Sequence, residues 1–171
     1  MNSKALRNRR TCFIAAALAA GLFALLVFPR ASWAAPWNNI EPLKSRRADV
    51  ERILGKPLNE APGEAGTLHF KVNGGTVTVA FVTARFVANK KLFPELEGTV
   101  LQIVLQHERS TDTPESMNLA KNPDFKREDV KDGAIYRNLK DGIVYTFIGG
   151  QLKTTRYSPS ADQLMRAQKG K

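Results

Sequence analysis

Short stretches in which apolar and polar residues alternate fill the middle of this chain, and they constrain its fold more than any other feature. In TLHFKV (67–72) every second residue is apolar, a period of two that is typical of a half-buried β-strand. The stretch TVTVAFVTARF (76–86) alternates in the same way and follows the turn sequence NGG at 73–75. Asn and Gly adopt positive φ at little cost, so the two stretches predict a β-hairpin.

Four further stretches predict strands of the same kind. They are TVLQIVLQH (99–107), GAIYRNL (133–139), GIVYTFI (142–148) and QLKTTRY (151–157). The short turn sequences KDG and GG separate the last three, which favours a tight meander. No long helical crossover lies between any two strands, which excludes a parallel α/β fold. The sequence therefore predicts a single α+β domain, with an antiparallel sheet of about six strands in two meanders and a few short helices.

SRRADVERILGKP, at residues 45–57, predicts a short helix that ends in a loop. Ser45 is a suitable N-cap, because its hydroxyl can accept a hydrogen bond from the first turn. The apolar face and the end of this helix are formed by Val50, Ile53, Leu54, Gly55 and Pro57. The glycine tolerates the left-handed backbone that ends a helix, and the proline prevents its continuation.

Two helical turns are predicted in the polar region between the meanders, at TPESMNL (113–119) and NPDFKREDV (122–130). Each begins with a capping residue that is followed by proline. The chain closes with a short helix and a basic, frayed tail at residues 166–171. With an extended arm at 35–44, the folded domain is predicted over residues 45–165.

Residues 1–34 have the order of a secretory signal: a basic end, an apolar segment and a small-residue cleavage site. MNSKALRNRR carries four basic residues and no acid, and an apolar run follows at residues 11–28. Ser32 and Ala34 have the small-x-small spacing that signal peptidase recognises. The sequence therefore predicts a cut between Ala34 and Ala35.

The alternative is that residues 11–28 remain as a membrane anchor, because the run approaches the roughly 18 residues that suggest a spanning helix. Both interpretations place the domain outside the cytoplasm, either periplasmic or secreted, since basic residues stay on the inner side of the membrane. Contact with a membrane is expected only through an uncleaved amino-terminal segment.

Removal of the signal would halve the net charge of the chain. There are 26 basic and 16 acidic residues in total, and residues 1–34 hold five of the basic ones and none of the acidic ones, which leaves a net charge of +5. The single cysteine, Cys12, lies in the apolar run. The mature domain is therefore expected to have neither a disulfide nor thiol chemistry.

Residues that commonly carry catalysis or bind metals are sparse. His69 is predicted on the polar face of its strand, and His107 on the apolar side at the end of another. Without cysteine or HxxxH spacing they make a poor zinc site, and no nucleophile signature is present. We therefore expect no catalytic residue, no metal and no cofactor. The alternative is a small hydrolase whose carboxylates meet only in the fold.

Basic residues gather around the first predicted helix, in KSRRADVERILGK. No aromatic residues interleave with them as stacking platforms, so nucleic acid is not the expected partner. Such a cluster suits an acidic protein or an anionic envelope component such as lipid or lipopolysaccharide. The simpler interpretation is a solvated helix face, on which Arg47 and Glu51 have the i,i+4 spacing of an ion pair.

SRRADVERILGKP also resembles the helix-to-loop motif, DV-x-x-[IL]-LG-x-P, of small exported α+β domains of the SmpA/OmlA outer-membrane assembly type. YTFIGGQLKTTRY (145–157) is similar to the strand–turn–strand that follows in such domains. The same architecture, duplicated, is found in secreted β-lactamase-inhibitor proteins. The resemblance implies an exported, non-enzymatic binding domain in which the motif is structural. Its residues are Asp49, Val50, Ile53, Leu54, Gly55 and Pro57.

Overall fold

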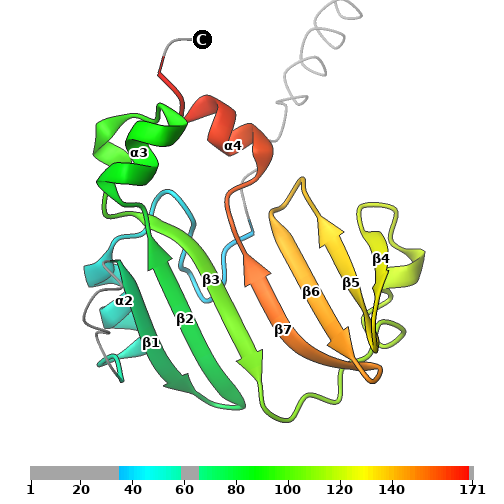
Figure 1. The fold of residues 1–171 in the computed structure, drawn as a ribbon. Coiled ribbons are helices and arrows are strands. Elements are labelled where there is room, and N and C mark those ends of the chain that lie inside the picture. The colour runs from blue at the N-terminus through cyan, green and yellow to red at the C-terminus, as the bar shows by residue number, and fades with distance from the viewer. Residues whose placement is uncertain (1–34, 59–65, 170–171) are drawn as a thin grey trace, which may run out of the picture. The chain divides into compact units, whose positions relative to one another are not determined.

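The computed structural model describes residues 35–58 and 66–169, in which seven strands form one antiparallel sheet (Figure 1). The strands are β1 (Thr67–Val72), β2 (Gly75–Phe81), β3 (Val100–His107), β4 (Lys126–Val130), β5 (Gly133–Asn138), β6 (Ile143–Ile148) and β7 (Gln151–Tyr157). The helices are α2 (Arg47–Leu54), α3 (Ala84–Lys90) and α4 (Ala161–Arg166), with the 3-10 turns η2 (Pro94–Leu96) and η3 (Leu119–Lys121). This is the predicted α+β domain. The signal or anchor predicted over residues 1–34 lies outside the described residues.

The sheet consists of two meanders that meet in its middle. Its strand order is β1-β2-β3-β7-β6-β5-β4, so the chain crosses from β3 to the far edge and returns strand by strand to pair β7 with β3. At the junction, Ile103 lies opposite Tyr157 and Leu105 lies opposite Thr155. The two predicted meanders are therefore present, and one continuous ladder joins them.

The strand count differs from the prediction because β4 is formed by residues 126–130, where the sequence predicts a helical turn. All five residues of β4 are exposed, so this edge strand has no apolar alternation to reveal it. The turn predicted over 113–119 does form, since the Met117 N–H donates to the Thr113 carbonyl at 3.1 Å and η3 follows.

The strand predicted over 76–86 is also too long. It ends at Phe81, and α3 begins at Ala84. Thr83 causes the change, because its hydroxyl accepts a hydrogen bond from the Phe86 N–H at 3.2 Å and so caps the new helix. This is the ordinary chemistry of a threonine N-cap.

One face of the sheet carries the core. Register places Phe70, Val77, Leu105, Thr155, Tyr145 and Tyr136 side by side in a row that crosses the sheet. At one end of this row, α2 and the arm cover the sheet, with Val50 and Ile40 fully buried. At the other end the segment that contains η3 covers it, and Phe125 stacks on Tyr145 with ring centroids 5.6 Å apart. We call this side the covered face.

Candidate functional site

The opposite side of the sheet, which we call the open face, is formed by two rows of mostly polar side chains. One consists of His69, Thr78, Val104, Arg156, Val144 and Arg137. The other consists of Lys71, Thr76, Gln106, Thr154, Thr146 and Ile135. Cross-strand partners point to the same side of a sheet, so these side chains form one continuous surface.

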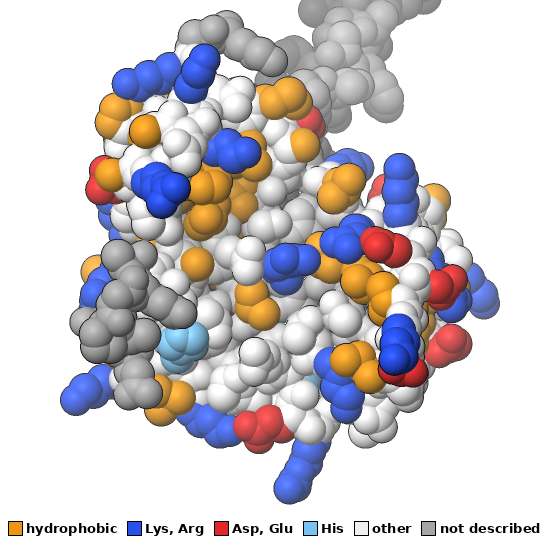
Figure 2. All heavy atoms as spheres, viewed as in Figure 1, with side chains coloured by type: hydrophobic (Ala, Val, Ile, Leu, Met, Phe, Trp, Pro, Cys, Tyr) orange, Lys and Arg blue, Asp and Glu red, His pale blue; other side chains and the backbone are white. Residues whose placement is uncertain are grey.

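Most side chains of the open face stay in contact with solvent, whereas Val144 is 8% exposed. Burial alternates along β2 and β5, with residues of the covered face buried and those of the open face only partly so. In Figure 1 the strands lie in front of α2 and the arm, and no described helix lies in front of the strands. Figure 2, drawn from the same side, shows mainly uncharged surface over the middle of the sheet, with scattered cations and with acids toward the margins.

Arg156 lies at the centre of the open face. It pairs with Val104 on β3 and with Val144 on β6, so an apolar side chain flanks it on each side. Nearer the sheet edges the cations are neutralised: Arg137 bonds to Glu128 at 3.0 Å, and Lys71 is paired with Glu108. Within residues 35–58 and 66–169, Arg156 has no such acidic partner.

The two histidines lie on opposite faces, which keeps them from forming a common site. His69 is on the open face, as its position in the strand predicted, with its Nδ1 3.1 Å from the Thr78 hydroxyl. His107 is on the covered side, with its Nε2 2.9 Å from the Thr155 hydroxyl. Burial lowers the pKa of His107, and the Asp112 carboxylate opposes that shift. No group of three or more His, Cys, Asp or Glu side chains suited to a metal gathers in the part of the chain that the structure describes.

The surroundings of two tyrosines next to Thr155 also shift their pKa values. Burial raises the pKa of Tyr157 to about 12, with a smaller contribution from Tyr145. Burial raises the pKa of Tyr145 as well. Both side chains belong to the covered face, where their rings pack beside the core. The raised pKa values of both tyrosines therefore result from packing.

The residues of the helix-to-loop motif make contacts within the fold. Asp49 accepts a hydrogen bond from the Arg46 N–H at 3.0 Å, and this bond, followed by the charge of Arg52, lowers the pKa of the carboxyl. Ile53 and Leu54 pack against the core beside the buried Val50. Gly55 has the left-handed φ that the sequence predicts, at +83°, and Pro57 follows in the loop.

The start of this helix differs from the prediction, whereas its ion pair is confirmed. The helix begins one residue later than a Ser45 cap would give, with Arg46 at the N-cap. Ser45 instead accepts a hydrogen bond from the Glu41 N–H at 2.9 Å. The predicted ion pair is present, since Arg47 Nε lies 2.7 Å from Glu51 Oε1. The cations of α2 thus form ion pairs within the helix itself.

Comparison with known proteins supports the fold and goes no further. No model of a protein family matches the chain, and no curated protein matches it. A similar solved structure is that of a DUF4309 family protein (YjgB) from Bacillus subtilis subsp. subtilis str. 168. It has 14% sequence identity and a TM-score of 0.51, and the alignment covers 74% of this chain and 88% of that one. At this identity the likeness concerns the α+β fold alone.

None of the helices among the described residues combines the length and the apolar character that crossing a membrane requires.

Proposed function

We propose that this chain is an exported, non-enzymatic binding domain, and that an acidic partner protein docks on its open face around Arg156. The observation that carries the proposal is the central position of Arg156 between two apolar neighbours, with no acid beside it among the described residues. An unneutralised cation in a partly apolar setting favours an anionic group on the partner and fixes its orientation.

The dimensions of the open face suit a protein. Seven strands at the usual spacing span about 29 Å, which is the scale of one side of a standard protein interface. Threonine and glutamine side chains supply hydrogen-bond donors and acceptors around the centre. The two rows contain no Phe, Tyr or Trp, so the stacking platforms of single-stranded nucleic-acid binding are missing from them.

Export is part of the same proposal. The signal-like order of residues 1–34 supports an extracytoplasmic location, either periplasmic or secreted. In the alternative form, residues 11–28 anchor the domain and contact the membrane while the domain lies outside. The resemblance of residues 45–57 and 145–157 to the SmpA/OmlA assembly type supports a binding role in the envelope or beyond it.

A hydrolase receives less support. Its most suitable base, His107, has its Nε2 against a hydroxyl, that of Thr155. A base lies against its nucleophile in this way, but Thr155 is only 3% exposed, which leaves its hydroxyl out of reach of a substrate. We therefore prefer binding over catalysis as the function of this domain.

Photo-crosslinking in the producing cells tests this proposal. A photoreactive residue at Thr78, on the open face, should form an adduct with one envelope protein. The same residue at Ser116, an exposed position in the segment over the covered face, should not. Adducts from Ser116 alone would overturn the proposal. So would recovery of lipid or polysaccharide, and no protein, from Thr78, because the partner would then be an anionic envelope component.

A further inference from the structure

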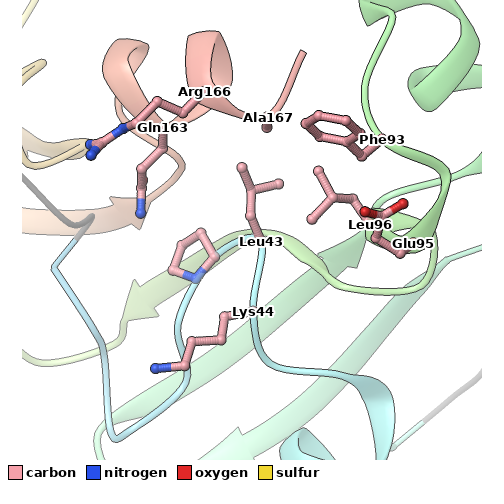
Figure 3. A pocket seen from close by; sticks show the side chains of 9 residues that line it. Leu43, Lys44, Phe93, Glu95, Leu96, Gln163, Arg166 and Ala167 are labelled. Carbon is pink, nitrogen blue, oxygen red and sulfur yellow. The ribbon is translucent and has the colours of Figure 1, made fainter. Parts of the chain in front are cut away.

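A groove separate from the open face lies between the arm, the η2 turn and α4 (Figure 3). It has a volume of about 490 Å³, within the range of small-molecule sites. Its apolar lining consists of Pro42, Leu43, Phe93, Leu96 and Ala167. Phe93 remains 39% exposed, so the groove presents apolar surface that the fold itself does not bury.

Leu43 is held in the groove by a strained backbone. Its φ is +59°, a left-handed value that a bulky side chain rarely adopts. The Leu43 N–H donates to the Val100 carbonyl at 2.7 Å, and Pro42 before it is fully buried. These contacts fix the conformation that directs the leucine side chain toward Ala167 (Figure 3). Strain of this kind is often retained at ligand-binding positions.

The wall formed by α4 is fixed at its end. The Phe93 N–H donates to the Ala167 carbonyl at 2.9 Å, and the Lys169 N–H donates to the Lys91 carbonyl at 2.8 Å. No residue of α4 itself is buried. The residues that follow its carboxyl end therefore hold the helix beside the groove, and its side chains contribute little to the core.

The groove is electrically asymmetric. Lys44, Gln163 and Arg166 lie toward one side, and Glu95 lies toward the other, with the apolar residues between them (Figure 3). Lys44 pairs with Glu41 at 2.9 Å, and Arg166 Nε donates to the Asp162 carbonyl at 3.3 Å. Both cations are exposed, and exposed contacts of this kind are weak. An incoming anion can therefore share or replace them.

We propose that this groove binds a single-chain anionic amphiphile, namely a fatty acid. The carboxylate would lie at Lys44 and Arg166, and the hydrocarbon chain would lie along Leu43 and Leu96 toward Phe93. The apolar lining selects the chain through burial, and the two cations select the charge of the headgroup. This site is distinct from the open face and does not depend on Arg156.

Calorimetric titration of the purified protein tests the proposal, with dodecanoate and dodecyltrimethylammonium as probes of equal chain length and opposite charge. Dodecanoate should bind at least about tenfold more tightly than the cation. Ala167→Trp, which fills the groove, should weaken dodecanoate binding at least about tenfold. Leu96→Glu provides a second test if the tryptophan disturbs folding, which the melting temperature would reveal.

Three further variants distinguish binding in the groove from binding elsewhere on the protein. Lys44→Gln combined with Arg166→Gln should remove the preference for the anion and retain some binding of the chain. Leu139→Ser, which removes an apolar side chain that is 65% exposed in the β5–β6 turn, should change nothing, and neither should Arg156→Gln. Equal binding of both probes by the parent would overturn the proposal. So would full dodecanoate binding by both Ala167→Trp and Leu96→Glu.

Discussion

Arg156 lies directly opposite Val104 across the β3–β7 junction, the point where the two meanders become one sheet. Its neighbours in β7, Thr155 and Tyr157, point to the covered face, where Thr155 is 3% exposed. A slip of one residue in this ladder would exchange the two sides, burying the guanidinium and exposing the tyrosine. The packing of the covered face therefore fixes Arg156 at the centre of the open face.

The helix-to-loop motif should show the sensitivity of a structural element. Leu54 is partly exposed and packs against the core, so Leu54→Ala should lower the free energy of unfolding by roughly 2 kcal/mol, at the low end for such truncations. Arg47→Ala removes an exposed ion pair and should stay within about 0.5 kcal/mol of the parent. Denaturant unfolding of both variants measures the difference. A neutral Leu54→Ala would mean that α2 is not packed on the sheet.

Tyr157 should make stability fall at high pH. Its pKa is raised to about 12 in the folded protein, against about 10 in an unfolded chain. The neutral ring therefore contributes stability that is fully present below about pH 10 and is lost as the pH rises toward the folded pKa. Ultraviolet titration should show Tyr157 as the last tyrosine to ionise, after Tyr145, whose pKa is raised less, and Tyr157→Phe should remove that last step. Retention of the late step in Tyr157→Phe would show that the tyrosine had been wrongly assigned.

His107 should make the stability of the protein fall at acid pH. Burial lowers its pKa in the folded state, so below the unfolded value of about 6.5 the unfolded chain binds more protons and stability declines as the pH falls. His107→Gln should reduce this decline between pH 7 and 5, measured by denaturant unfolding. His69→Gln, on the open face, should change the melting temperature little. Stoichiometric zinc in protein purified without added metal would contradict both assignments.

The part of the fold that sequence could predict is the part with apolar alternation. β1, β5, β6 and β7 agree with the predicted ranges within one residue at each end. One side of β1 and of β5 is buried, and the turn sequences KDG and GG bound β6. β4 lacks that signal. Its sequence, KREDV, is exposed throughout, and its charges pair locally, as Arg127 does with Asp129 at 2.7 Å. Charges on an edge strand hinder pairing with other chains. They also leave the strand without the apolar alternation that predicts a strand.

The candidate site was harder to predict than the fold. Arg156 does not belong to the basic cluster that is visible in the sequence, and its central position depends on β7 lying between β3 and β6. That order follows from long-range pairing, which no local pattern records. A shift in register between Thr146 and Phe147 further obscures the alternation of β7. The basic cluster around α2 was the visible signal, and two of its arginines, Arg47 and Arg52, pair with acids of the same helix.

The proposed export predicts Ala35 as the amino terminus of the mature protein. Ser32 and Ala34 give the small-x-small pair, and cleavage after Ala34 leaves no proline directly after the cut. Amino-terminal sequencing of extracytoplasmic material measures this. Recovery of Met1 in a membrane fraction would instead support the anchor formed by residues 11–28.

The affinity of the partner that is crosslinked at Thr78 tests the central claim most directly, when it is measured for the parent, Arg156→Gln and Arg47→Gln. Arg47 is the matched control, since it is an exposed arginine on α2, on the other side of the sheet. Arg156→Gln should weaken binding at least about tenfold and reduce its dependence on salt, while Arg47→Gln binds like the parent. Full binding by Arg156→Gln together with a loss in Arg47→Gln would show that α2, and not the open face, is the recognition surface.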